Sequence, residues 1–203
     1  AKDHAHLYGD GLFEGIRIYG KKVFKLDEHL DRLFHGITYL GFTMPMTKEE
    51  LRAQVLEVCA KADMEEAYIR LNVTRGTGLG LDPKSIVRAN VMIMISKLNL
   101  YPQELHENGL RCNLSPVRVI PPDSLDPKCK CIGRYASNIL AKQIANRQGV
   151  NDCLMLNHNG YICEGTGNNV FLVKGNVIST PHPVCGILVG ITRNLIIEMA
   201  RKE

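Results

Sequence analysis

The order of β-like and helix-like segments constrains the fold of this chain most. Residues 13–26 have the pattern of two short strands joined by a turn, and two segments of helical period follow at 27–42 and 47–63. Ahead of the second helix, Thr47 and Glu50 stand three residues apart, which is the spacing of a capping box. The first part of the chain is therefore expected to mix strands and helices.

The rest of the chain repeats this mixture of strands and helices. It has no internal repeat and more hairpin-like pairs than a doubly wound sheet would need, so we expect a mixed fold, α/β or α+β. The expected strands are 66–76, 88–98 and 110–119, the expected hairpins are 152–165 and 168–180, the expected helices are 135–148 and 190–203, and a loop is expected over 121–133.

A polar, turn-rich stretch at 101–109 suggests a domain boundary. With 203 residues and 45% hydrophobic composition, the chain can bury one large core or two small ones. We therefore predict a first domain over 1–100, an interdomain loop over 101–109 and a second domain over 110–203.

The charge distribution excludes some classes of partner. The 25 Lys and Arg residues exceed the 21 Asp and Glu residues by four, and the excess is spread along the chain. A nucleic-acid partner usually requires a clustered basic face, so none is expected. There is no apolar run of about 18 residues and no secretory leader pattern, so we expect no membrane partner and a cytoplasmic location.

The seven cysteines are odd in number and include no C-x-x-C pair, which argues against a disulfide framework or a structural zinc site. Cys129 and Cys131 flank Lys130 too closely for a usual zinc pair, and no metal site is expected. Free thiols in a reducing cytoplasm are the simplest interpretation. A reactive thiol stays open, because Lys130 and Arg134 would both favour a thiolate.

Two residues have chemistry that a catalytic site can use. Lys130 lies between a loop and a helix start, where burial would lower its pKa and free the amine to form a Schiff base with a carbonyl. Glu164, among small residues, could meet a pyridine nitrogen and keep it protonated. Taken alone, each is more often an ordinary residue, Lys130 a solvated lysine and Glu164 a turn glutamate.

Three further features suit anions. The segment 190–193 opens the last helix with a glycine and a threonine, which can cradle a phosphate or merely cap the helix. Arg32 could reach a phosphate, or form an ion pair with Glu28 four residues earlier on the same helix. Tyr68 and Arg70 would share one face of a strand and could bind a carboxylate, or form a polar sheet face.

These features occur together with further motifs in one order along the chain. That order resembles the class IV aminotransferases, which are fold-type IV pyridoxal-phosphate enzymes, and most closely the branched-chain amino-acid aminotransferases. The motifs are YGDGLFEGIR at 8–17, EHLDRL at 28–33, YIR at 68–70, Lys130 with Tyr135, EGTGNNVF at 164–171 and GILVGITR at 186–193.

The resemblance implies a pyridoxal 5′-phosphate cofactor and a role for each matching residue. Lys130 would hold the cofactor as a Schiff base, with Tyr135 by its phenolic oxygen and Glu164 at its pyridinium nitrogen. The cysteines would then be bystanders. The phosphate would be bound by Arg32, Ile191 and Thr192, and the substrate by Tyr8, Tyr68 and Arg70.

The resemblance also implies an architecture. A smaller α/β domain would end near residue 100, and a larger domain would carry Lys130. The site would lie between the two domains and be closed by a loop of a second subunit, so a homodimer is expected.

The implied reaction is ping-pong transamination of leucine, isoleucine or valine with 2-oxoglutarate, as in branched-chain amino acid biosynthesis. The alternatives are a D-amino-acid aminotransferase, an aminodeoxychorismate lyase of the same fold, or a non-catalytic binding or thiol-sensing protein on this scaffold.

Two departures from the family pattern stand out. Family members usually have asparagine just before the tyrosine, where this chain has Arg134, a cation expected to act on the phenolic side of the cofactor. They also have a strand before the point where this chain begins, and a second phosphate-binding turn after the point where it ends. We therefore expect a chain truncated at both ends.

Overall fold

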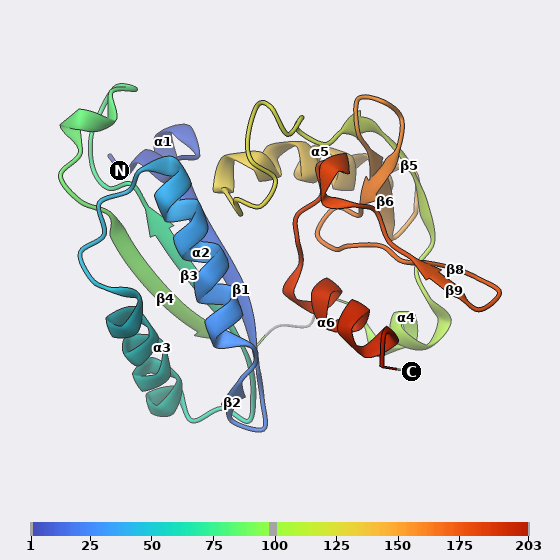
Figure 1. The fold of residues 1–203 in the computed structure, drawn as a ribbon, viewed down its shortest axis with the longest axis horizontal. Coiled ribbons are helices and arrows are strands. Elements are labelled where there is room, and N and C mark those ends of the chain that lie inside the picture. Colours follow the sequence, from blue (N-terminus) through green and yellow to red (C-terminus); the bar gives the residue numbers. More distant parts are fainter. Residues whose placement is uncertain (1, 98–100, 203) are drawn as a thin grey trace. The chain divides into compact units, whose positions relative to one another are not determined.

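The computed structural model describes residues 2–97 and 101–202, which divide into two compact units (Figure 1). One unit falls within Ala1–Asn99 and Cys129–Gly133, and the other within Leu100–Lys128 and Arg134–Glu203. Residue 98 of the predicted strand 88–98, residues 1, 99 and 100 of the predicted first domain, and residue 203 of the predicted last helix lie outside the described residues.

The first unit is built on a four-stranded antiparallel sheet in the order β2-β1-β3-β4. The predicted hairpin over 13–26 is confirmed as β1 and β2, and the two later strands are confirmed as β3 and β4. The elements of this unit are α1 (His4–Tyr8), β1 (Gly11–Tyr19), β2 (Lys22–Val23), α2 (Leu26–Leu40), α3 (Lys48–Ala62), β3 (Glu66–Thr74), a 3-10 helix (Pro83–Ser85) and β4 (Asn90–Ser96).

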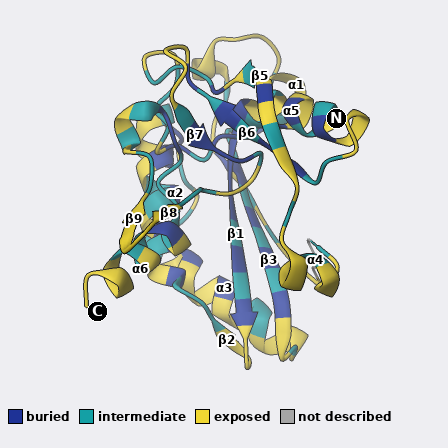
Figure 2. Cartoon of the chain, turned by 90° about the vertical axis from the view of Figure 1, so that its right-hand side faces the viewer, coloured by how far each residue is buried: buried dark blue, intermediate teal, exposed yellow. Residues whose placement is uncertain are grey.

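Strand periodicity gives this sheet two different faces. Buried residues alternate with more exposed ones along β3 (Figure 2). One face is apolar and lies against the two long helices, α2 and α3 (Figure 1). We call the opposite face the second face. From β1 and β3 it carries Phe13, Gly15, Arg17, Tyr68, Arg70 and Asn72.

Both predicted long helices are confirmed, and local signals set their ends. The capping box of α3 is present: the Glu50 N–H donates to Thr47 Oγ1 (3.2 Å), and the Thr47 N–H donates to Glu50 Oε2 (2.8 Å). The apolar side of each helix supplies core residues, among them Leu30 of α2 and Val55 of α3, both without exposed surface.

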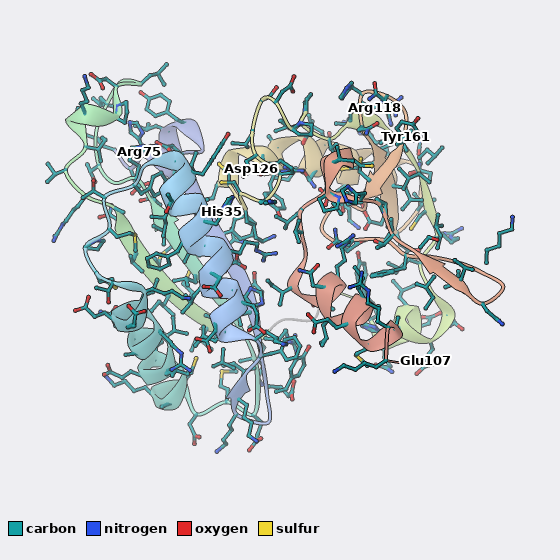
Figure 3. All side chains as sticks on the ribbon, viewed as in Figure 1. His35, Arg75, Glu107, Arg118, Asp126 and Tyr161 are labelled. Atoms are coloured by element: carbon teal, nitrogen blue, oxygen red, sulfur yellow. The ribbon has the colours of Figure 1, made fainter. Side chains whose placement is uncertain are left out.

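Arg75, labelled in Figure 3, joins the end of β3 to two other parts of the first unit. Its guanidinium donates to Asp10 Oδ2 (2.5 Å) and to the Leu40 carbonyl (2.9 Å), and it lies 4.6 Å from the centre of the Phe42 ring. A planar guanidinium can make such contacts at once. The turn before β1 and the end of α2 are thereby fixed to β3.

The segment around Lys130 lies beside β1 in the first unit. The Phe13 N–H donates to the Lys130 carbonyl (3.1 Å), Leu12 forms an antiparallel bridge with Cys131, and the Gly133 N–H donates to the Gly9 carbonyl (3.0 Å). The loop predicted over 121–133 therefore ends in a strand-like piece paired with β1. Lys130, assigned from the sequence to the second domain, packs within the first unit.

Gly9→Ala is expected to destabilise the protein more than Gly41→Ala. Both glycines end a helix with positive φ, +72° and +66°, so alanine costs each about 1–2 kcal/mol. A Cβ at position 9 would lie 2.7 Å from Gly133 Cα, whereas nothing lies within 4 Å of one at position 41. The overlap should add about 1–3 kcal/mol, measured by urea unfolding. Equal losses would show that the contact with Gly133 carries no energy.

The second unit has a three-stranded sheet in the order β5-β6-β7. The β5–β6 pair is parallel, with α5 as the connecting helix, and the β6–β7 pair is the predicted hairpin at 152–165. The predicted hairpin at 168–180 is confirmed as β8 and β9. The elements are α4 (Gln103–Asn108), β5 (Cys112–Arg118), α5 (Tyr135–Arg147), β6 (Asp152–Leu156), β7 (Ile162–Glu164), β8 (Leu172–Lys174), β9 (Val177–Ser179), a 3-10 helix (Pro183–Cys185) and α6 (Ile191–Ala200), and a 3-10 helix (Ile132–Arg134) leads into α5.

Helix α5 packs on this sheet around a small core. The core residues are Val119, Ala141, Ala145, Cys153, Met155, Cys163 and Ile187. The predicted mixed α/β fold is thus confirmed in both units.

The stretch 101–109 is not wholly a loop, as the sequence led us to expect. It contains α4, which starts after Pro102 and has no buried residue. A helix of six polar or half-buried residues lacks the apolar period that indicates a helix in sequence. The predicted division into domains at this stretch stays a prediction. Within 2–97 and 101–202, no helix is long and apolar enough to cross a membrane.

Candidate active site

In the first unit, Lys130 and Arg70 contact the same aromatic ring. Lys130 Nζ lies 4.6 Å from the centre of the Phe13 ring, and Arg70 Cζ lies 3.5 Å from it. Arg70 also donates through Nε to Asn72 Oδ1 (2.8 Å), which fixes its guanidinium plane. Two cations therefore gather on the second face of the sheet, an arrangement that suits an anionic ligand.

Tyr68 lies on the same face, as the strand period predicted. A Cβ at Gly15 would lie 2.6 Å from the Tyr68 hydroxyl, so the glycine leaves the space that the phenol occupies. The pairing of Gly15 with Arg70 and of Arg17 with Tyr68 sets this register. The structure thus brings Lys130, Tyr68 and Arg70 to one face.

Tyr8 ends helix α1 in the same unit. Its hydroxyl accepts a hydrogen bond from the Gly80 N–H (3.0 Å), and its ring meets the His4 ring edge-on, with the centres 4.8 Å apart. Tyr8 thereby holds the glycine-rich loop between β3 and β4, and 44% of its surface stays exposed.

Arg32 is bound by Glu14 and not by Glu28, the partner that the sequence suggested. Arg32 donates through Nε to Glu14 Oε1 (2.8 Å) and through Nη2 to Oε2 (2.6 Å), while Glu28 pairs with Lys25 (2.6 Å). His29 Nδ1 lies 2.7 Å from Glu14 Oε2. Glu14 is fully buried on the helix-facing side of β1, so its charge depends on these partners.

Sequence reasoning missed Glu14 as a functional candidate. Burial, the largest single effect, raises its pKa, but the hydrogen bonds and charges of Arg32 and His29 together hold the pKa below its usual value. Glu14 is therefore an ionised group that fixes the Arg32 side chain. An acidic residue at an inward-facing position of an apolar strand was the sequence signal that could have revealed it.

In the second unit, Glu164 and Tyr135 line one small pocket, together with Asn138, Gly165, Gly167, Asn168, Asn169 and Leu188. Glu164 is buried, and its Oε2 accepts a hydrogen bond from the Leu188 N–H (2.9 Å). A buried carboxylate and a phenol at the edge of one pocket can address two sides of a flat ring.

Arg134 lies against Glu164, with Nη2 3.5 Å from Oε1. Its position just before Tyr135 had suggested an effect on the phenolic side of the cofactor. That effect stays a prediction, and the structure adds a contact that the sequence did not suggest. The guanidinium neighbours the carboxylate expected at the ring nitrogen.

A buried aspartate, also missed from the sequence, holds the loop after β7. Asp152 accepts hydrogen bonds from Thr166 Oγ1 (2.6 Å) and from Asn168 Nδ2 (2.8 Å). Asn138 Nδ2 in turn donates to the Thr166 carbonyl (2.9 Å). These bonds fix the pocket wall that follows Glu164. Asp152 gave no sequence signal, because it reads as a polar residue at a strand end.

Helix α6 begins with an uncapped turn at Ile191 and Thr192. Its N-cap residue is Gly190, without a side-chain hydrogen bond to the first turn. The first N–H groups of a helix have no acceptor within that helix, so they can bind an anion. A Cβ at Gly190 would lie 2.1 Å from Asn169 Oδ1, so a larger residue at this position would displace the Asn169 side chain.

The two cysteines that flank Lys130 are buried in the first unit. Cys131 Sγ donates to the Gly9 carbonyl (3.5 Å). All seven cysteines are free, as predicted. Among the described residues, no group of three His, Cys, Asp or Glu side chains could hold a metal ion.

Comparison with known proteins decides the family. The model of the family described as amino-transferase class IV matches residues 11–203. The chain belongs to the class IV aminotransferases. Over 202 residues it is 43% identical to a Methanocaldococcus jannaschii protein named "Putative branched-chain-amino-acid aminotransferase", covering 99% of this chain and 69% of the relative. Over 205 residues it is 34% identical to the branched-chain-amino-acid aminotransferase of Escherichia coli K12, covering 98% and 66%.

Solved structures agree with this membership. The crystal structure of the Escherichia coli branched-chain amino acid aminotransferase superposes on this class IV aminotransferase with a TM-score of 0.95 at 33% identity, over 100% of this chain and 68% of that one. The T.th. branched-chain amino acid aminotransferase with pyridoxamine 5′-phosphate gives 0.91 at 32% identity, over 98% and 67%. The chain thus spans about two thirds of the length of these four proteins.

The cofactor of this family is pyridoxal phosphate, and the donor groups of this aminotransferase chain fit it. The first unit contains an amine, Lys130, and a guanidinium, Arg32, which are the types of group that bind an aldehyde and a phosphate. The second unit contains the Glu164 carboxylate and the Tyr135 phenol in one pocket, and a helix start after Gly190 without a side-chain cap.

Proposed function

We propose that this protein transfers the amino group of leucine, isoleucine or valine to 2-oxoglutarate, with pyridoxal phosphate held by Lys130. The observation that carries the proposal is the placement of Lys130 and Arg70 on one Phe13 ring. An amine for the cofactor then lies beside a guanidinium for a substrate carboxylate. The names of relatives at 32–43% identity support the substrate class.

The bound cofactor supplies an electron sink, and the protein supplies orientation and proton transfer. In the proposed reaction, the Lys130 amine, once released by the substrate, carries the proton to and from the substrate α-carbon. Tyr135 would donate to the phenolic oxygen, and Glu164 would keep the ring nitrogen protonated. The phosphate would be bound by Arg32, Ile191 and Thr192.

Substrate binding is proposed for Tyr8, Tyr68 and Arg70. Arg70 has the planar fork that suits a carboxylate, and Asn72 holds that fork in place (2.8 Å). The second face also offers apolar surface, because Met94 pairs with Arg70 across β3 and β4 and therefore lies on the same side. An apolar wall beside a carboxylate clamp suits a branched aliphatic amino acid.

The proposal also includes a homodimer, which the family resemblance implies, and a cytoplasmic location, which the free cysteines suggest. Neither alternative enzyme has comparable support. A Legionella pneumophila structure named "Putative 4-amino-4-deoxychorismate lyase" is only 22% identical, so its TM-score of 0.85 shows a shared fold alone.

The test is a comparison of amino donors. L-Leucine should convert the purified protein's bound cofactor to the pyridoxamine form, followed by absorbance, and 2-oxoglutarate should restore it. D-Alanine and aminodeoxychorismate should react much more slowly. A preference for D-alanine would contradict the proposed substrate class, while a lack of response to every donor would contradict the proposed activity.

A further inference from the structure

Arg134 is a buried cation with incomplete hydrogen bonding. Its side chain is 4% exposed. Nη2 donates to the Gly186 carbonyl (2.5 Å) and lies 3.5 Å from Glu164 Oε1. Nη1 is buried and has no hydrogen-bond partner in the part of the chain that the structure describes. Burying a guanidinium is unfavourable unless an opposite charge compensates, and Glu164 provides that charge.

Arg134 and the backbone of one short segment hold the Glu164 carboxylate on both sides. The Leu188 N–H donates to Oε2, while Arg134 faces Oε1. Arg134 is itself anchored on Gly186, two residues before Leu188, and Ile187 between them is fully buried. The carboxylate is therefore fixed in place by an anchored cation and an anchored amide.

The Cys163 thiol is a further titratable group near this pair. The pKa of the Cys163 thiol is raised to about 12, chiefly by burial and further by Cys185 and Glu164. It is therefore uncharged at neutral pH. Tyr135 lines the same pocket as Glu164 and is a phenol. The Cys163 thiol therefore adds no negative charge beside Arg134 and Glu164.

A cation beside a carboxylate stabilises its ionised form and makes it a weaker base. A protonated ring nitrogen bound to this carboxylate would donate its hydrogen bond to a weaker base. It would also lie near the fixed positive charge of the guanidinium. Both effects make protonation of the ring nitrogen less favourable, because it would place a positive charge near the guanidinium.

We propose that Arg134 is a positioning residue for Glu164, and that its guanidinium lowers the proton affinity of the cofactor's ring nitrogen. The inference rests on the proposed function, because it needs the ring nitrogen at Glu164. It adds that Arg134 sets how strongly the cofactor ring withdraws electrons.

The test measures the nitrogen directly. Wild type, Arg134→Gln and Arg134→Lys are reconstituted with pyridoxal phosphate labelled with ¹⁵N in the ring, and the nitrogen signal is followed by NMR against pH. Arg147→Gln is the matched control, since it removes one exposed cation from helix α5.

Arg134→Gln should bind the ring proton about tenfold more tightly than wild type, the effect of roughly one unit of pKa. Arg134→Lys should show a smaller rise, because its ammonium keeps the charge but lacks the planar guanidinium that bonds both Gly186 and Glu164. Arg147→Gln should match wild type. If Arg134→Gln does not fold, the test is the rise in proton affinity of the ring nitrogen in Arg134→Lys.

Each other outcome overturns the inference. An unchanged or weaker proton affinity of the ring nitrogen in the folded Arg134 variants would overturn this inference. The proposed function would stand, because the cofactor would still be bound by lysine. A wild type that forms no lysine-bound cofactor would overturn the proposed function and this inference together.

Discussion

Glu14→Gln is expected to lower the free energy of unfolding by about 3–5 kcal/mol, the usual cost of breaking a buried ion pair. The substitution keeps the size of the side chain and removes its charge. Arg32, with 10% of its side chain exposed, and His29 then lose the carboxylate that they share. Urea unfolding followed by circular dichroism measures the change.

Glu28→Gln is the matched control for this substitution. Glu28 lies on the surface of α2 and pairs with Lys25 at 2.6 Å. Exposed pairs contribute about 0–1 kcal/mol, so this variant should stay within that range. Replacing both Glu14 and Arg32 by apolar residues, Leu and Met, should restore part of the stability, because no uncompensated charge is then buried. A loss of under about 1 kcal/mol in Glu14→Gln would contradict the account.

The stability that Glu14 contributes should depend on pH in one direction. Its pKa in the folded protein lies below the usual value of 4.5, and the group is therefore more acidic folded than unfolded. Its contribution is present above the unfolded-state pKa and is lost as pH falls through the folded-state pKa. The difference between wild type and Glu14→Gln should be largest at neutral pH and shrink below pH 4.5. A difference that grows towards acid would contradict this sign.

Lys130→Ala is expected to abolish amino transfer and the absorbance of lysine-bound cofactor. The substitution removes both the group that holds the cofactor and the group that moves the proton. Loss of the proton-transfer role alone costs about 10²- to 10⁴-fold. Steady-state assays with L-leucine and 2-oxoglutarate, together with absorbance spectra, measure the two effects.

Lys128→Ala controls for the loss of a lysine from the same segment. Lys128 is exposed two residues before the candidate, and its substitution should change neither readout. Ser in place of Cys129 or Cys131 should likewise leave the spectrum in place. The thiol-sensing alternative makes the opposite prediction: ligand binding that survives Lys130→Ala and is lost with the cysteines.

Local sequence signals were enough for most of the fold. The capping box at Thr47 and Glu50 and the alternation along β3 depend on residues a few positions apart, so periodicity and spacing identify them. Helix α4 was missed because none of its residues is buried, so its sequence has no apolar residues at helical spacing.

The partner of Arg32 shows where local reasoning stops. Glu28 is near in sequence, but Glu14 on β1 is the residue that Arg32 meets once α2 packs on the sheet. Such a contact follows from helix packing and strand register, neither of which a spacing of four residues contains.

The candidate site divides in the same way. The period of β3 was enough to place Tyr68 and Arg70 on one face. It could not show that Lys130 meets the same Phe13 ring as Arg70, because that depends on the pairing of the segment around Lys130 with β1. The contact of Arg134 with Glu164 joins residues of two elements and was equally hidden.

The most direct test of the account is to find which residue carries the cofactor. The protein is mixed with pyridoxal phosphate and reduced with borohydride, which makes the linkage permanent, and its peptides are then analysed by mass spectrometry. The account predicts one phosphopyridoxyl group, on Lys130. A label on another lysine, or no label at all, would contradict it.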